Sequence, residues 1–251
     1  MIPVLVAHRG YMEKYPENSL SALRAALEAG ACLVEFDIQM DANGELVLLH
    51  DDTFKRTANA SGSVFEQQDY TRISVHEPQR FADRFYPEAV PTLAQAMELL
   101  MRYPQSTAFV EIKDESLQRW GMENVVDEVL RGIERAKHQC VLISDNLDAL
   151  LYAGGKAGTR IGWVIHRYDH SIHRLADEHG PDFMICNYKR INGDLWQGAW
   201  QWMLYDISDP ELALEWASKG AGLIETRDIG GMLQHTLLQQ RACHQQDDDQ
   251  A

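Results

Sequence analysis

The stretch LVEFDIQMDANGELVLLH, residues 33–50, combines a strand pattern with a turn signal, and together these decide the fold. Its first half is an apolar, β-rich run in which Glu35 and Asp37 alternate with apolar side chains. The following Asn43-Gly44 is typical of a two-residue hairpin loop, so we expect the chain to fold back on itself. This pairing places His50 opposite Asp37 and returns it to the carboxylate-bearing end of the strand.

Comparable apolar runs alternate with amphipathic helical patterns along almost the whole chain. The strand candidates are Val4–His8, Leu33–Ile38, Ala108–Lys113, Cys140–Ser144, Ile161–Ile165, Phe183–Cys186, Trp202–Tyr205 and Leu223–Glu225. The helix candidates are Leu20–Ala29, Leu93–Arg102, Met122–Ala136, Leu147–Ala153, Ile172–His179, Pro210–Lys219, Gly231–Gln240 and, with a weaker pattern, Gly193–Trp200. Eight βα repeats in 251 residues match an α/β fold of the (β/α)8 TIM barrel type, whose functional residues lie at the carboxyl ends of the strands. A doubly wound open sheet is the alternative, but no G-x-G-x-x-G follows the first strand.

The remaining segments fit a single barrel domain over residues 1–251. Residues 51–91 are rich in Thr, Ser, Asn, Gln and Pro, so we expect a small insertion with short helices after the second-strand hairpin. Residues 245–251 contain three consecutive aspartates and are expected to form a disordered, solvated tail.

Composition and charge exclude several classes of function. The chain has 23 Lys and Arg against 38 Asp and Glu, a net charge of −15, which repels phosphate backbones, so we expect no nucleic-acid partner. No apolar run reaches the ~20 residues of a membrane span, and Ile2–Ala7 is too short for a signal core, so we expect a cytoplasmic protein. The sequence does not indicate an oligomeric state. Four cysteines form no C-x-x-C pair and are interpreted as ordinary thiols: Cys32, Cys140, Cys186 and Cys243.

Carboxylates gather at the ends of the second and third strands. Glu35 and Asp37 are two residues apart, so their Cα atoms lie roughly 6.6 Å apart on one face, and both side chains can reach one cation. Inward-facing carboxylates are costly unless a metal or a basic residue compensates them, and a salt bridge is the alternative to a metal. Glu111 offers a third oxygen ligand, and such ligands favour Mg²⁺ or Ca²⁺ over zinc.

Basic and imidazole side chains are expected at the same end of the barrel. His8-Arg9 ends the first strand, where a histidine can transfer a proton and a guanidinium can contact phosphate. Lys113 either contacts phosphate or pairs with Glu111. Glu17 can orient a ligand or a side chain, whereas Asn18-Ser19 is expected to cap the first helix.

Six motifs occur in an order and spacing that resembles the glycerophosphodiester phosphodiesterase family over about the first half of the chain. They are Val6-Ala7-His8-Arg9-Gly10, Pro16-Glu17-Asn18-Ser19, Val34-Glu35-Phe36-Asp37, Val47-Leu48-Leu49-His50-Asp51, Pro91-Thr92-Leu93 and Val110-Glu111-Ile112-Lys113. The second half is similar mainly in its βα rhythm. Three positions depart from the family pattern: Ser19 replaces a Thr, Leu204-Tyr205-Asp206 stands where Trp-Thr is frequent, and Glu225-Thr226-Arg227 replaces a frequent Thr-Asp.

The resemblance implies a metal-dependent barrel enzyme that hydrolyses small glycerophosphodiesters to sn-glycerol 3-phosphate and an alcohol. It further implies that Glu35, Asp37 and Glu111 bind a divalent cation, Mg²⁺ or Ca²⁺, and that His8 and His50 are the catalytic acid/base pair. Arg9 and Lys113 are then expected to contact the phosphate, with Glu17 supporting the substrate site.

This chemistry predicts in-line displacement, in which one histidine takes a proton from the nucleophile and the other protonates the leaving alcohol. The nucleophile is either water or the neighbouring glycerol hydroxyl. Alternatives are a lysophospholipid-directed phosphodiesterase of the same barrel type, a non-catalytic module that binds a phosphate ligand, and a metal-dependent sugar isomerase, which does not need both histidines.

Overall fold

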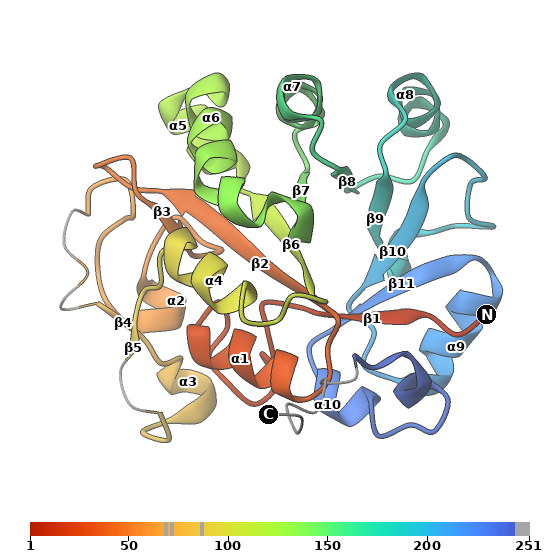
Figure 1. The fold of residues 1–251 in the computed structure, drawn as a ribbon, viewed down its shortest axis with the longest axis horizontal. Coiled ribbons are helices and arrows are strands. Elements are labelled where there is room, and N and C mark those ends of the chain that lie inside the picture. The colour runs from red at the N-terminus through yellow and green to blue at the C-terminus, as the bar shows by residue number, and fades with distance from the viewer. Residues whose placement is uncertain (68–69, 71–72, 86–87, 244–251) are drawn as a thin grey trace, which may run out of the picture.

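The computed structural model describes residues 1–67, 70, 73–85 and 88–243, so the predicted tail at 245–251 lies outside the described residues. Eight parallel strands form a closed barrel, and all eight predicted strands are confirmed (Figure 1). In spatial order they are β1 (Val4–Ala7), β2 (Leu33–Met40), β6 (Thr107–Ile112), β7 (Cys140–Ser144), β8 (Ile161–Ile165), β9 (Phe183–Asn187), β10 (Gln201–Tyr205) and β11 (Ala221–Thr226). The barrel closes because β1 pairs with both β2 and β11.

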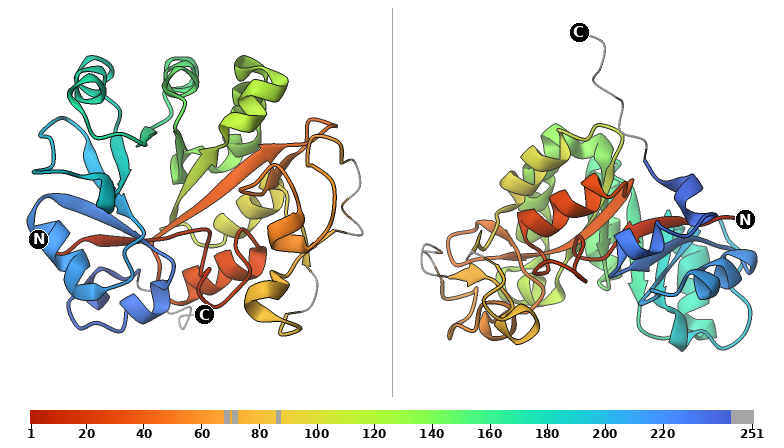
Figure 2. Two further views of the ribbon diagram at one scale, coloured as in Figure 1. Left: turned by 180° about the vertical axis from the view of Figure 1, so that it is seen from behind. Right: turned by 90° about the horizontal axis from the view of Figure 1, so that it is seen from below.

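Helices lie around the outside of the barrel (Figures 1 and 2). They are α1 (Leu20–Glu28), α4 (Leu93–Leu100), α5 (Asp114–Trp120), α6 (Met122–Ile133), α7 (Leu147–Ala157), α8 (His170–His179), α9 (Pro210–Ser218) and α10 (Ile229–Met232), with 3-10 turns at Glu134–Gln139, Tyr188–Arg190 and Leu238–Arg241. The sequence predicted α1, α4 and α6 to α9, but not α5. Among the described residues, none of the helices is both long and apolar enough to cross a bilayer.

Two helix predictions are wrong. Gly193–Trp200 forms an irregular loop, in which Trp196 stacks on Tyr168 with ring centroids 3.9 Å apart. Gly231–Gln240 is interrupted, because α10 ends at Met232 and a separate 3-10 turn follows. The adjacent glycines of α10 have low helix propensity, which favours the short helix.

Alternation along the strands divides the core into two parts. Side chains on one face fill the barrel interior: Val6, Phe109, Val141, Ile143, Val164, Phe183, Ile185, Met203 and Leu223. Side chains on the other face, including Val34 and Phe36, belong to the core between strands and helices. Glu35 and Asp37 alternate with these outward residues and therefore point into the barrel.

The hairpin after β2 is confirmed, but its predicted register is wrong by one residue. β3 (Leu46–Leu48) pairs antiparallel with β2, with Ile38 opposite Leu48. Leu49 rather than His50 donates its backbone N–H to the carbonyl of Asp37, at 3.1 Å.

The register differs because the loop contains three residues instead of two. The Asp41 carboxylate accepts hydrogen bonds from the backbone N–H groups of Asn43 and Glu45, both at 2.8 Å. Gly44 has a φ of 82°, as expected where a turn is followed by a left-handed residue. His50 nevertheless lies at the carboxyl end of the barrel.

Residues 51–91 contain the short elements expected of an insertion: α2 (Lys55–Ala58), β4 (Ser74–Val75), α3 (Pro78–Phe81) and β5 (Glu88–Ala89). A small core joins them to the hairpin, and its buried side chains are Val47, Leu49, Phe54, Ala58, Val64, Ile73, Val75 and Val90. These elements lie beside the end of β2, at the left of Figure 1. The insertion therefore places some of its polar residues next to the barrel opening.

Two of the four cysteines form a disulfide, so their interpretation as thiols is wrong. Cys32 precedes β2 and is bonded to Cys243, with Cα atoms 5.0 Å apart and a sequence separation of 211. Barrel closure brings these positions together, and no local spacing pattern could indicate it. Cys140 and Cys186 are free and buried, as predicted.

Gly10 follows β1 at a φ of 76°, where a Cβ would lie 2.5 Å from the carbonyl carbon of Ala22. We expect Gly10→Ala to lower the free energy of unfolding by about 2–5 kcal/mol, through left-handed backbone strain and overpacking. Gly44→Ala is the matched control, because Gly44 has a similar φ of 82° but nothing within 4 Å of its Cβ. Denaturant melts of both variants should show the larger loss for Gly10→Ala; equal losses would contradict the close approach to α1.

Candidate active site

A cavity of about 230 Å³ opens among residues at the carboxyl ends of the barrel strands. It is lined by His8, Arg9, His50, Glu111, Lys113, Ile143, Val164, His166, Ile185, Tyr205, Asp206 and Glu225. A larger cavity of about 490 Å³ lies at the amino ends, but no His, Asp or Glu is among the lining residues that the structure describes. The reactive side chains therefore lie at the end of the barrel that the sequence predicted.

Three carboxylates meet at β2 and β6. One oxygen from each of Glu35, Asp37 and Glu111 lies within 4.8 Å of the others. Burial, with the nearby charge of Asp37, raises the pKa of both Glu35 and Glu111. Ionised together, these carboxylates repel one another and attract a cation.

Asp37 is the best compensated of the three carboxylates. Its Oδ2 lies 3.0 Å from Nε of Arg9, and its Oδ1 lies 3.5 Å from Nζ of Lys113. Burial alone would raise its pKa, but these two cations hold the pKa of Asp37 well below its usual range. Lys113 also donates a hydrogen bond to Glu111 at 2.9 Å, the carboxylate pairing that the sequence allowed.

Glu35 has far less compensation. Its Oε2 accepts the backbone N–H of Arg9 at 2.9 Å. Its Oε1 is buried and has no hydrogen-bond partner among the described residues. An orphaned carboxylate oxygen in a purely acidic group fits a hard divalent cation, which takes oxygen ligands. The group of Glu35, Asp37 and Glu111 could therefore hold Mg²⁺ or Ca²⁺.

Ser19 or Asn18 was expected to cap α1, and this prediction is confirmed for Ser19 and wrong for Asn18. Ser19 alone is the N-cap, since its side chain accepts the N–H of Ala22 at 3.0 Å. Asn18 instead donates its amide to Oδ2 of Asp37 at 2.9 Å and accepts the backbone N–H of Asp37 at 3.1 Å. The left-handed backbone of Asn18, at a φ of 55°, is compatible with this turned-in position.

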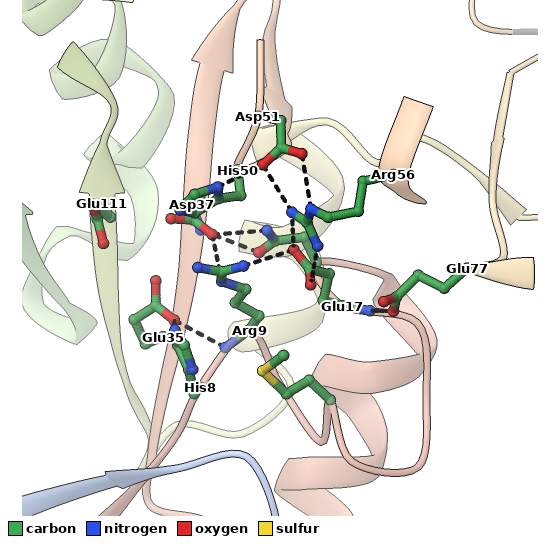
Figure 3. A network of polar contacts seen from close by, with 12 residues as sticks. His8, Arg9, Glu17, Glu35, Asp37, His50, Asp51, Arg56, Glu77 and Glu111 are labelled. Atoms are coloured by element: carbon green, nitrogen blue, oxygen red, sulfur yellow. Dashed lines mark hydrogen bonds and ion pairs between the residues drawn. The ribbon is translucent and has the colours of Figure 1, made fainter. Parts of the chain in front are cut away.

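Glu17 joins two arginines, Arg9 and Arg56 (Figure 3). It accepts hydrogen bonds from Arg9 at 2.8 Å and from two nitrogens of Arg56 at 2.6 and 2.8 Å. Burial would raise its pKa, but the hydrogen bond from Arg56 and the charges of both arginines lower the pKa of Glu17. Glu17 is absent from the described lining of the 230 Å³ cavity, so its position suits orientation of Arg9 better than direct contact with a ligand.

The two histidines have different surroundings. His8 is 19% exposed, with Nε2 4.0 Å from Glu35, and burial with the charge of Arg9 lowers the pKa of His8 to about 3. Nδ1 of His50 lies 2.7 Å from Oδ1 of Asp51, and Asp51 is held in turn by Arg56 (Figure 3). Hydrogen bonds from His50 and Arg56 outweigh burial and lower the pKa of Asp51, so this carboxylate is ionised beside the imidazole.

The structure brings all eight predicted site residues to this end of the barrel, but it also places others that sequence reasoning missed. Arg56 lies in the short helix α2, in a part of the sequence that has no regular period to mark it. Glu225 was noticed only as a departure from a family motif. Its spacing of two from the interior residue Leu223 is the signal that could have placed it inside the barrel.

Residues 8–177 match the model of the glycerophosphoryl diester phosphodiesterase family. The chain is 36% identical over 103 residues to a glycerophosphodiester phosphodiesterase of Caldanaerobacter subterraneus subsp. tengcongensis, covering 40% of this chain and 41% of that protein. It is 37% identical over 112 residues to glycerophosphodiester phosphodiesterase 1 of Mus musculus, covering 43% of this chain and 33% of that protein. Each match therefore spans less than half of the relative's length.

Solved structures share the fold over nearly the whole chain. A phosphodiesterase of Oleispira antarctica, in complex with the product sn-glycerol-3-phosphate, has a TM-score of 0.83 at 20% identity, covering 93% of this chain and 96% of that one. A putative glycerophosphoryl diester phosphodiesterase of Silicibacter pomeroyi has a TM-score of 0.82 at 19% identity, covering 96% and 95%. The family model matches more than half of the sequence, and the chain therefore belongs to the glycerophosphoryl diester phosphodiesterase family.

Proposed function

We propose that this protein hydrolyses glycerophosphodiesters to sn-glycerol 3-phosphate and an alcohol, with the help of a divalent cation. The supporting observation is one cavity that gathers His8, His50, Glu111, Lys113 and Arg9 from separate parts of the chain. A phosphodiester resists attack because its negative charge repels nucleophiles and its leaving alkoxide is a strong base. Positive charge in the cavity reduces the repulsion of the nucleophile, and two imidazoles can transfer the protons that the nucleophile loses and the leaving alkoxide gains.

Glu35, Asp37 and Glu111 would hold the cation, as Mg²⁺ or Ca²⁺, since all their donor atoms are carboxylate oxygens. When bound, such a cation stabilises negative charge on the phosphoryl oxygens.

Arg9 and Lys113 would contact the phosphate from fixed positions. Arg9 is held by Glu17 at 2.8 Å and Asp37 at 3.0 Å, and Lys113 by Glu111 at 2.9 Å. Side chains fixed in this way need little rearrangement when charge develops on the substrate, which favours the transition state. Glu17 thus supports substrate binding by positioning Arg9.

His50 would donate the proton and His8 would accept it. The ionised Asp51 lies 2.7 Å from Nδ1 of His50 and fixes the orientation of the ring. Burial and the charge of Arg9 lower the pKa of His8 and keep its ring neutral, which is the form that can accept a proton. His8 takes a proton from the attacking water or glycerol hydroxyl as the new P–O bond forms; the bond to the alcohol oxygen breaks, and that oxygen takes a proton from His50. If the glycerol hydroxyl attacks, water must then open the cyclic phosphate to give glycerol 3-phosphate.

Product release from a substrate panel tests this proposal. We expect glycerol 3-phosphate to be released from glycerophosphocholine, glycerophosphoethanolamine or glycerophosphoglycerol, with a loss of at least about 100-fold in EDTA that Mg²⁺ or Ca²⁺ restores. Phosphorus NMR during turnover identifies the nucleophile, because attack by the glycerol hydroxyl gives a transient cyclic phosphate and attack by water does not.

Parallel assays of lysophosphatidylcholine and glycerophosphocholine distinguish the proposed activity from that of a lysophospholipid-directed phosphodiesterase. A strong preference for the lysolipid would replace the proposed substrate class. Binding of glycerophosphodiesters without any turnover would contradict the enzymatic proposal and support a binding module.

A further inference from the structure

Glu225 is a buried carboxylate that the proposed mechanism does not use. It lies at the end of β11, next to β1 in the barrel, and only 4% of it is exposed. Its side chain lines the 230 Å³ cavity. Its side chain has no hydrogen bond or ion pair with any described residue, although its carboxylate is close enough to interact electrostatically with Glu111 and Arg9.

One side-chain oxygen of Glu225 lies close to Glu35. It belongs with Glu35 and His8 to a group whose ligand atoms are all within 4.8 Å of one another. Ca²⁺ binds oxygens at about 2.3–2.6 Å, so two oxygens separated by this distance can lie on opposite sides of one ion. Hard cations prefer carboxylate oxygen to imidazole nitrogen, which favours Glu225 over His8 as the partner of Glu35.

The distribution of basic side chains shows where the cavity lacks positive charge. Arg9 pairs with Glu17 and Asp37, and Lys113 pairs with Asp37 and Glu111. Within the described chain, no Lys or Arg side chain forms an ion pair with Glu35, whose Oε1 is buried and unpartnered, or with Glu225. The uncompensated negative charge is therefore located on Glu35 of β2 and Glu225 of β11. It is not spread evenly over Glu35, Asp37 and Glu111.

We infer that Glu225 is a further oxygen ligand of the divalent cation, which it binds together with Glu35. The inference rests on the cation site of the proposed function and adds a ligand from β11 that the family motifs do not include. The two metal-ligand groups together contain four carboxylates, Glu35, Asp37, Glu111 and Glu225. Against the two cations Arg9 and Lys113 this gives the group a net charge of −2 when all are ionised, and one divalent ion neutralises it. The added oxygen also suits Ca²⁺, which takes more ligands than Mg²⁺.

Isothermal titration of the metal-free protein with MgCl2 and CaCl2 tests the inference. We expect Glu225→Gln to raise the Kd by about 10–100-fold, as for loss of a group that supports a metal site, with the larger change for Ca²⁺. Asp206→Asn is the matched control: Asp206 lines the same cavity but accepts a hydrogen bond from Asn187 at 2.6 Å and belongs to neither metal-ligand group. This control should bind both ions as the unaltered protein does.

Thermal melts in EDTA provide a readout independent of catalysis. Glu225→Gln removes repulsion with Glu35, so the metal-free variant should melt higher than the unaltered protein, while its gain in Tm with metal should be smaller. A variant that melts lower in EDTA and keeps the original metal Kd would overturn the inference and assign Glu225 a packing role. An unchanged metal Kd with a raised KM for ammonium-bearing substrates only would also overturn it, in favour of a contact with the alcohol.

Glu35→Gln separates failure of the inference from failure of the proposed function. If Glu35→Gln abolishes metal binding and Glu225→Gln does not change it, the cation site stands and the role of Glu225 is refuted. If the unaltered protein binds neither ion, the cation site of the proposed function is itself wrong, and the inference falls with it.

Discussion

Glu35→Gln is expected to lower kcat/KM by at least about 10³-fold while the barrel stays folded, because an essential charge in the metal site is lost without a change in side-chain size. Glu35 is 2% exposed, its Oε1 has no partner among the described residues, and burial raises its pKa. A neutral amide therefore relieves repulsion in the metal-free protein. Activity assays should be combined with melts in EDTA, where we expect the variant's Tm to equal or exceed that of the unaltered protein.

Asp37→Asn is the informative comparison for Glu35→Gln. We expect a similar loss of activity but a lower Tm in EDTA, since Asp37 pairs with Arg9 and Lys113, and its replacement leaves each of these buried cations with one carboxylate partner fewer. Near-normal turnover in either purified variant would refute its assignment as a metal ligand.

His50→Gln is expected to lower kcat by about 10²–10⁴-fold for substrates with alkyl alcohol leaving groups, which is the usual contribution of general acid–base catalysis. The loss should be much smaller for a p-nitrophenyl ester of glycerol phosphate, because this leaving group departs without protonation. His8→Gln should lose activity on both substrates, since the proton acceptor acts on the nucleophile. Steady-state kinetics of the two variants on the two esters gives the comparison.

Asp51→Asn provides a positioning control for His50. It removes the charge 2.7 Å from Nδ1 of His50, so we expect an intermediate loss with the same dependence on leaving group. Metal affinity measured by titration should be unchanged in both His50→Gln and Asp51→Asn. Equal losses of His50→Gln on the alkyl and p-nitrophenyl esters would contradict its role as the acid.

The sequence predicted the parts of the site that follow from strand periodicity. Glu35 and Asp37 alternate with Val34 and Phe36, so one face had to carry both carboxylates, and parallel strands bring their carboxyl ends to one edge. His8 and Glu111 follow from the same rule. Strand periodicity indicated only where these residues lie, and the family motifs predicted which of them bind the cation and which transfer protons.

Features that depend on contacts between distant segments could not be predicted in this way. The hairpin register depends on hydrogen bonds that the Asp41 carboxylate accepts from the backbone N–H groups of Asn43 and Glu45, which give a three-residue loop in place of a two-residue loop. Arg56 reaches Glu17 from a segment without a regular period. Asn18 has a typical capping residue type, and only the position of Asp37 beside it shows its different role. The disulfide also bears on the predicted cytoplasmic location, which stays a prediction, because such bonds persist mainly in oxidising compartments.

The bond between Cys32 and Cys243 has a consequence for the opposite end of the barrel. It connects the residue before β2 with the segment after β11, and β1 lies between these two strands in the sheet. The disulfide thus links the two sides of the position where β1 closes the barrel. It also restricts the denatured chain over a loop of 211 residues, which stabilises the fold by about 5 kcal/mol in the chain-entropy model. The free energy that the disulfide adds at the amino ends of the strands can offset the repulsion among the carboxylates at the carboxyl ends in the metal-free protein.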